Sequence, residues 1–148
     1  MKNIKDIFSI VLIISFVTYS SCKKKGTDPQ PDPLADRLEE LINNGSSWEV
    51  SEVTKDGYDV TDQFNGFTLT IGEFTYTTTN ALESAWSSSG TWSFLNNDAS
   101  TILRDDDTII DVGISGGQLT LTFSVDDLSS GGRLRGINGD YQFVMLSQ

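Results

Sequence analysis

From Trp48 onward, apolar and polar residues alternate with a period of two, which is the pattern of strands with one buried face. Turn residues such as Asp56-Gly57 and the stretches "NND", "RDDD" and "SGG" separate the alternating segments. Short turns between one-sided strands predict an antiparallel up-and-down meander, and closure of the meander into a barrel removes both exposed edges. The predicted fold is therefore an all-β, eight-stranded antiparallel barrel with strands at residues 47–55, 66–72, 73–79, 90–95, 99–105, 108–115, 118–125 and 140–146.

One face of these strands is apolar, whereas the other face is mostly Thr, Ser and Asp. An eight-stranded barrel is either just filled by its side chains or holds one small ligand, and the aromatic residues here bury about 150 Å² or more apiece. The pattern leaves both alternatives open. The predicted inner face consists of Phe67, Leu69, Ile71, Phe74, Tyr76, Trp92, Phe94, Ile110, Val112, Ile114, Leu119, Leu121, Phe123, Val125, Tyr141, Phe143 and Met145.

One short α-helix is predicted before the strands, over residues 34–43. Asp32 is a suitable N-cap, Pro33 suits the first turn, and "NNG" ends the helix near Gly45. A helix this short needs a partner surface, which is either the barrel itself or another protein. Its apolar residues recur at helical spacing: Leu34, Leu38, Leu41 and Ile42.

The N-terminus has the features of an export signal. Lys2 and Lys5 precede an apolar run of eleven residues, 7–17, and small polar residues then precede Cys22. Eleven residues extend about 16 Å as a helix, whereas a bilayer core needs about 20 residues. Residues 1–21 are therefore predicted to be a cleaved signal peptide.

The sequence "TYSSC" that ends this signal resembles the lipobox of bacterial lipoproteins, although Tyr19 stands where that family prefers Leu. The resemblance implies lipid attachment at Cys22 and anchoring to the outer membrane, with the periplasmic face favoured and the cell surface as the alternative. An ordinary secretory signal with an incidental Cys is the other interpretation. Residues 22–33 then form a Pro-rich tether of roughly 3 Å per residue.

Several stretches after the helix resemble the small lipocalin-like domains of Bacteroidetes-type lipoproteins: "DGYDVTDQFNGFTLTI", "SSGTWSF", "RDDDT", "LTLTFSV" and "GGRLRGINGDYQFVML". The resemblance implies a lipocalin-like barrel domain over residues 34–148 and a cup for a small apolar or amphipathic molecule. Trp48 follows "GSS" and not the Gly-x-Trp opening of true lipocalins, and Arg133 and Arg135 precede the last strand.

Composition excludes several functions. The 148 residues carry a net charge of −11, which argues against nucleic-acid binding. His is absent and Cys22 is the one cysteine, so the usual Ser-His and Cys-His pairs and an internal disulfide are excluded. No acid and base pair stands out, and we predict neither an enzyme nor a cofactor or metal site. The run 105–107 (Asp-Asp-Asp) is interpreted as a solvated turn in preference to a calcium site.

Trp86 is the most informative candidate, because it lies in the polar segment "NALESAWSSSG" that shows no strand periodicity. It either caps the barrel end or faces a ligand or partner. If Trp86 lines a mouth, the predicted wall is Tyr76, Trp92, Phe94 and Phe123. Arg133 and Arg135 are a candidate anion contact, with pairing to neighbouring Asp as the commoner outcome.

Two functional hypotheses follow. The first is a non-enzymatic, outer-membrane-anchored lipocalin-like lipoprotein that binds a small hydrophobic or amphipathic molecule. The second is a filled barrel that serves as a structural or accessory subunit of a cell-envelope assembly, with an envelope protein as its partner. The membrane is a partner in both cases, through the acylated Cys22.

Overall fold

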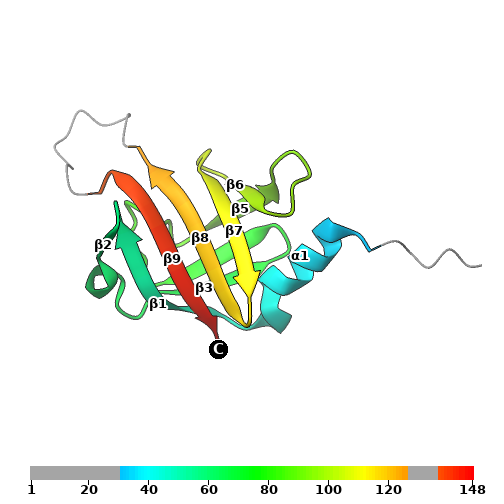
Figure 1. The fold of residues 1–148 in the computed structure, drawn as a ribbon, viewed down its shortest axis with the longest axis horizontal. Coiled ribbons are helices and arrows are strands. Elements are labelled where there is room, and N and C mark those ends of the chain that lie inside the picture. The colour runs from blue at the N-terminus through cyan, green and yellow to red at the C-terminus, as the bar shows by residue number, and fades with distance from the viewer. Residues whose placement is uncertain (1–30, 127–136) are drawn as a thin grey trace, which may run out of the picture. The chain divides into compact units, whose positions relative to one another are not determined.

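The structure, a computed structural model, describes residues 31–126 and 137–148, and Figure 1 shows its fold. Alternation of apolar and polar residues produces nine strands in this part of the chain, together with one α-helix and two 3-10 helices. In chain order the elements are α1 (Pro33–Ile42), η1 (Asn43–Gly45), β1 (Trp48–Lys55), β2 (Tyr58–Asp59), η2 (Thr61–Phe64), β3 (Thr68–Gly72), β4 (Thr75–Thr79), β5 (Ser89–Phe94), β6 (Thr101–Arg104), β7 (Ile109–Ser115), β8 (Gln118–Val125) and β9 (Gly139–Ser147).

Strand β1 closes the sheet into a barrel, because it pairs along one edge with β9 and along the other edge with β3. The pairing with β9 runs along all of β1, whereas the pairing with β3 involves only Trp48 and Glu49. Strands β3 to β9 follow one another as antiparallel neighbours. The predicted eight-stranded, up-and-down, lipocalin-like barrel preceded by one short helix is confirmed.

Two small elements between β1 and β3 were not predicted. Strand β2 pairs with the end of β1. It has only two residues, and a strand this short shows no period-two pattern in the sequence. The 3-10 helix η2 brings Phe64 into the core with 1 % of its surface exposed. The Thr61 hydroxyl accepts a hydrogen bond from the backbone N–H of Val53 at 2.9 Å and so takes the place of a strand partner.

The alternating residues of the strands form the core as predicted, with one exception. Along β8, buried Leu119, Leu121 and Phe123 alternate with more exposed residues. Phe74 was wrongly placed on the inner face: it is 43 % exposed, and its φ of 59° lies in the left-handed region. It occupies the turn between β3 and β4, where the strand alternation no longer applies.

Helix α1 packs against the barrel, so the predicted helix is confirmed with bounds shifted by one residue. The Asp32 side chain caps it by accepting a hydrogen bond from the Leu34 N–H at 3.0 Å. Leu41 is fully buried, and its carbonyl accepts a hydrogen bond from Nε1 of Trp48 at 2.9 Å. These contacts fasten the helix to the first strand, in agreement with the packed alternative.

The barrel has two different ends. Helix α1 and the β3–β4 turn lie at one end, which we call the helix end. The other end, called the loop end, is formed by segments 56–67, 80–88 and 105–108, and strand β2, at the left of Figure 1, lies at this end. Trp86, on the 80–88 segment, and Arg104, at the end of β6, both lie toward the loop end.

Candidate functional site

The structure brings together three of the five predicted wall residues. Tyr76 on β4, Trp86 on the 80–88 loop and Phe123 on β8 are all buried, and the Trp86 ring centroid lies 6.0 Å from that of Tyr76 and 5.2 Å from that of Phe123. Trp92 on β5 is buried on a different side of the interior, where it contacts the half-buried Phe94 at 5.2 Å. Trp92 and Phe94 therefore form a second ring contact, and Trp92 lines the same small cavity as Tyr76 and Trp86.

Trp86 fills the middle of the barrel. Its side chain is 3 % exposed and makes further edge-on or tilted ring contacts with Phe67 at 6.2 Å and with Phe143 at 5.9 Å. Its indole N–H is buried and has no hydrogen-bond partner among the described residues. A buried donor without a partner costs about 1–3 kcal/mol. The Trp86 ring is thus well packed, but its indole N–H lacks a hydrogen bond.

Hydrogen bonds at both ends of the 80–88 loop hold Trp86 in the barrel. At the start, the Asn80 amide donates to the Gly66 carbonyl at 3.0 Å. At the end, Thr78 donates from its N–H to the Ser88 carbonyl at 2.8 Å and from its hydroxyl to the Ser87 carbonyl at 3.1 Å. Between these points the loop forms a single turn that aims the indole inward, so Trp86 reaches the core from a loop and not from a strand.

Arg104 lies directly against Trp86. It is the last residue of β6 and shares the inner face with Ile102, because residues two apart point the same way along a strand. Only 5 % of its surface is exposed, and its guanidinium carbon lies 4.7 Å from the centroid of the Trp86 ring and 5.8 Å from that of Phe123. This geometry is a cation–π contact in a poorly hydrated environment.

Asp106 neutralises the Arg104 guanidinium. Arg104 donates from Nε to Oδ1 at 2.9 Å and from Nη2 to Oδ2 at 2.6 Å, which is the bidentate geometry of a strong arginine–carboxylate pair. Both Nη atoms also lie 3.4 Å from the carbonyl oxygen of Ala85, and Nη2 donates to the Thr108 hydroxyl at 3.3 Å. Every terminal nitrogen of the guanidinium therefore has an acceptor.

The pairing is reflected in the acidity of Asp106. Partial burial alone would raise the pKa of this carboxyl, but the hydrogen bonds from Arg104 and Thr108 and the positive charge of Arg104 lower its pKa to about 2 from 3.8. The Arg104–Asp106 pair therefore remains ionised and carries no net charge at neutral pH. The run of three acidic residues forms a turn as predicted, but Asp106 binds Arg104 and is not simply solvated.

Burial also raises the pKa of the Tyr76 hydroxyl, and there it is not outweighed. Desolvation places this pKa above 10.0, the positive charge of Arg104 partly opposes the shift, and the charges of Asp105 and Asp106 add to it. The Tyr76 hydroxyl lies 3.5 Å from Oδ1 of Asp105, and the ring passes over Gly90, its cross-strand partner. Tyr76 is accordingly a neutral phenol that forms part of the interior wall.

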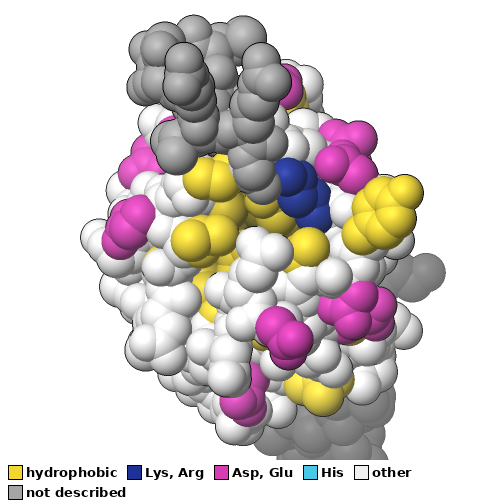
Figure 2. Space-filling view, turned by 90° about the vertical axis from the view of Figure 1, so that its left-hand side faces the viewer, with side chains coloured by type: hydrophobic (Ala, Val, Ile, Leu, Met, Phe, Trp, Pro, Cys, Tyr) yellow, Lys and Arg dark blue, Asp and Glu magenta, His cyan; other side chains and the backbone are white. Residues whose placement is uncertain are grey.

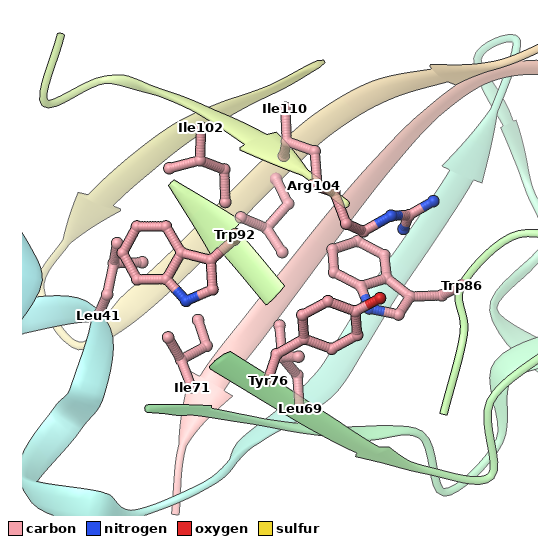
Figure 3. Close-up of a pocket in the computed structure, with 10 residues that line it drawn as sticks. Leu41, Leu69, Ile71, Tyr76, Trp86, Trp92, Ile102, Arg104 and Ile110 are labelled. Atoms are coloured by element: carbon pink, nitrogen blue, oxygen red, sulfur yellow. The ribbon is translucent and has the colours of Figure 1, made fainter. Parts of the chain in front are cut away.

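The space left inside the barrel is small. A cavity of about 20 Å³ separates Leu41 and Trp92 from Trp86 and Arg104, as Figure 3 shows. A cavity of this size has room for about one water molecule, whereas small-molecule sites measure about 300–1,000 Å³. In this conformation the barrel is filled. The cavity is lined by Leu41, Leu69, Ile71, Tyr76, Trp86, Trp92, Ile102, Arg104, Ile110 and Leu121.

A larger depression of about 310 Å³ lies on the outer side of Arg104. Arg104 lines both this depression and the small cavity, so the guanidinium lies between the interior and the outside. In Figure 2, which faces the left-hand side of Figure 1, hydrophobic side chains gather near the centre and acidic side chains lie around them. The depression is lined by Ser84, Arg104, Asp106, Thr108, Ser124, Val125, Asp126 and Ile137.

Arg104 was not among the residues predicted for the site. The signal was present in the sequence, because Ile102 and Arg104 occupy the same face of a predicted strand and an inward Ile implies an inward Arg. The predicted lipid attachment at Cys22 and the predicted anion contact at Arg133 and Arg135 lie outside the described residues.

Comparison with protein families, with curated proteins and with solved structures found no match to this chain. Within the described residues, the structure contains no helix with the length and apolar composition of a membrane span. In the same part of the chain, no three or more acidic side chains gather in a way that could hold a metal ion. The barrel and the contacts of Trp86 and Arg104 are therefore the basis for an assignment of function.

Proposed function

We propose that this chain is a lipid-anchored, non-enzymatic binding protein of the bacterial cell envelope that takes one small apolar or amphipathic molecule into its barrel. The proposal includes the resemblance to small lipocalin-like lipoproteins of Bacteroidetes-type bacteria and acylation at Cys22. The anchor is the outer membrane, with the periplasmic face favoured over the cell surface.

The observation that carries this proposal is the origin of Trp86. Several rings of the interior, such as Phe123 and Phe143, belong to strands, whereas Trp86 enters from the 80–88 loop. A loop is displaced at lower cost than a strand, because the barrel ladder stays intact while a few hydrogen bonds, the Trp86 ring, the buried Ala85 and the partly buried Leu82 leave the core. Movement of this single segment would convert a filled barrel into a cup.

The volume released by Trp86 is sufficient for a small molecule. Removal of the indole beside the existing cavity of about 20 Å³ leaves an apolar space on the order of 150 Å³, the size at which an engineered protein cavity binds benzene. The depression of about 310 Å³ on the other side of Arg104 gives a larger molecule further room. Such a site would take a ring system or a short chain and not a whole lipid.

A fluorescence titration tests this proposal. The chain from residue 22 onward, with Cys22→Ser to prevent acylation, is titrated with fractionated small-molecule extracts of the cell envelope while tryptophan emission is recorded. We expect a saturable change dominated by Trp86, because its indole would move from the core to solvent. A Trp86→Phe variant is the matched control and should lose most of the change. The absence of any saturable change in either protein would overturn the proposal.

The filled interior favours a second candidate, an accessory subunit of an envelope assembly. With room for about one water molecule, the barrel in this conformation is as well suited to structural support as to binding. Because Leu41 is in the core, a partner would have to use the half-buried Leu34 and Leu38 on α1. A specific partner that co-purifies with the wild-type chain and is lost in a Leu34→Glu variant supports this candidate, and an unchanged set of co-purifying proteins contradicts it.

The anchor is tested separately from the barrel. A Cys22→Ala variant should lose labelling by a radioactive fatty acid and should move from the membrane fraction to the soluble fraction. Labelling that persists in this variant would refute acylation at Cys22. Protease treatment of intact cells then distinguishes surface display, where the domain is degraded, from residence on the periplasmic face, where it is protected.

A further inference from the structure

We infer that the molecule taken into the barrel is neutral, with a flat apolar body that replaces the indole of Trp86 and a carbonyl-type oxygen that replaces the Ala85 carbonyl at Arg104. This inference rests on the proposed function and specifies its ligand. It is based on which contacts of Arg104 are lost and which remain when the 80–88 loop moves out of the barrel. We call the barrel without this loop the open barrel, and the barrel that contains Trp86 the closed barrel.

Two of the partners of Arg104 are neighbours on the loop. The Ala85 carbonyl accepts from Nη1 and Nη2 at 3.4 Å, and the Trp86 ring covers the guanidinium at 4.7 Å. Both must leave together, since they belong to consecutive residues. Figure 3 shows the guanidinium beside the indole at the edge of the cavity.

The other partners of Arg104 stay in place. Asp106 and Thr108 belong to the turn after β6, and Phe123 belongs to β8, so loop movement leaves them where they are. Nε and Nη2 remain bonded to the carboxylate, whereas Nη1 loses the acceptor that it has in the closed barrel. The open barrel therefore presents an unpaired guanidinium N–H and one bare face of the guanidinium to the emptied space.

The ligand must replace both the hydrogen-bond acceptor at Nη1 and the ring that covers the guanidinium. An unpaired donor of a buried charged group is costly, so a ligand without an acceptor would leave this cost in place. A flat apolar ring would restore the stacking on Arg104 and the contacts with Tyr76, Phe123 and Phe143 that Trp86 makes in the closed barrel. The ligand therefore combines a planar apolar body with one acceptor oxygen.

The charge balance selects a neutral acceptor over an anion. An isolated arginine in a barrel would attract a carboxylate, but Asp106 already supplies the negative charge in a bidentate pair. The pKa of Asp106 at about 2 keeps this carboxylate ionised at neutral pH. The exposed Asp105, whose Oδ1 lies 3.5 Å from the Tyr76 hydroxyl, adds a second negative charge on the surface at the same end of the barrel. A ligand carboxylate would thus meet like charges and be desolvated without a free counter-ion.

Three compounds of nearly equal shape test the inference: acetylnaphthalene, which is neutral with a carbonyl, ethylnaphthalene, which lacks an acceptor, and naphthoate, which is an anion at pH 7. Their affinities are measured by calorimetry for the chain from residue 22 onward with Cys22→Ser. They are measured also for the same chain with Trp86→Ala, in which the indole no longer fills the site and the Ala85 carbonyl stays on the loop. We expect the ketone to bind at least about tenfold more tightly than either of the others, and all compounds to bind more tightly when Trp86 is absent.

Substitution of Asp106 should reverse the preference for the ketone over naphthoate. In an Asp106→Asn variant the Arg104 charge has no counter-ion, so naphthoate should gain at least about tenfold relative to the ketone. Asp107→Asn, in the same turn, is the matched control and should leave the order of affinities unchanged. Asn is compatible with the φ of 65° at this position.

The outcomes separate this inference from the proposed function. Equal affinities for the three compounds, or tightest binding of naphthoate to the unmodified barrel, would overturn the neutral-acceptor inference and leave ligand binding standing. If no compound binds even when Trp86 is replaced, the inference fails. The titration with small-molecule envelope extracts then decides alone whether the barrel binds any small molecule. An Asp106→Asn variant with an unchanged order of affinities also contradicts the assigned role of Arg104.

Discussion

The Arg104–Asp106 pair offers a quantitative test, because one substitution removes its charge and almost none of its volume. Asp106→Asn keeps the shape of the side chain, and the Asn oxygen still accepts a hydrogen bond from the backbone N–H of Thr108, as Asp106 Oδ1 does at 3.2 Å. The charge-assisted bonds to the guanidinium are lost. Because the Asn amide nitrogen takes the place of Oδ2, which accepts from Nη2 at 2.6 Å, the variant removes the charge and this hydrogen bond together while the volume is kept.

The magnitude follows from the pKa of Asp106. A decrease from 3.8 to about 2 corresponds to about 2.4 kcal/mol, at about 1.36 kcal/mol for each pH unit. The Asp106 side chain is 45 % exposed, so solvent screening reduces this value, and we expect the variant to lose about 1–1.5 kcal/mol of unfolding free energy at pH 7.

The lowered pKa of Asp106 also predicts how the stability difference between wild type and variant changes with pH. The folded pKa of Asp106 is depressed, so its stabilisation is complete above the unfolded value of 3.8 and is lost as the pH falls through about 2. Urea unfolding of wild type and variant, followed by circular dichroism between pH 7 and pH 2, should therefore show a stability difference that shrinks toward zero at the acid end. Other carboxyl groups titrate in both proteins and cancel in the difference.

Two results would refute this reasoning. Equal stabilities at pH 7 would mean that the pair contributes nothing to folding. A difference that stays constant down to pH 2 would mean that the substitution acts through packing and not through charge. Asp107→Asn serves as the control, because it makes the same chemical change in an exposed position of the same turn.

Three further substitutions, the first of them paired with a control substitution at Gly113, test the packing of the barrel by the same unfolding measurement. Gly90→Ala should cost about 1–3 kcal/mol, since its Cβ would lie 2.6 Å from the Tyr76 hydroxyl, whereas Gly113→Ala, which meets only an ordinary contact at 3.8 Å, should cost much less. Leu41→Ala should cost about 2–5 kcal/mol, because the side chain is fully buried, and a cost below 1 kcal/mol would contradict the packing of α1 on the barrel. Trp48→Phe removes the 2.9 Å hydrogen bond to the Leu41 carbonyl and should cost at least about 1 kcal/mol, while an unchanged midpoint would show that this bond is dispensable.

The strands were predictable because their signal is local. All strands except the two-residue β2 alternate apolar and polar residues, as β8 does with Leu119, Leu121 and Phe123. The caps of α1 were predictable for the same reason, since Asp32 bonds to a residue only two positions away. Phe74 was wrongly predicted where a turn interrupts the alternation, and η2 was missed because four residues carry no period.

The contents of the barrel were not predictable from any local pattern. Whether eight strands enclose a cup or a filled core depends on which loop side chains enter, and Trp86 enters from a segment without periodicity. The burial of Arg104 depends on Asp106, two residues along, and also on Ala85 and Phe123, each 19 residues away in the chain. The predictions for Cys22 and for the 127–136 segment stay predictions.

The division between these two classes of feature has a physical cause. Periodicity records which face of an element is buried, because the hydrophobic effect acts on each residue according to its own side. The contact of a loop tryptophan with a buried ion pair arises only when distant segments converge, and its energy depends on distances that no single segment encodes. For this chain, the amino-acid pattern specifies a barrel, and the three-dimensional packing of Trp86 against Arg104 determines that the interior of the barrel is filled.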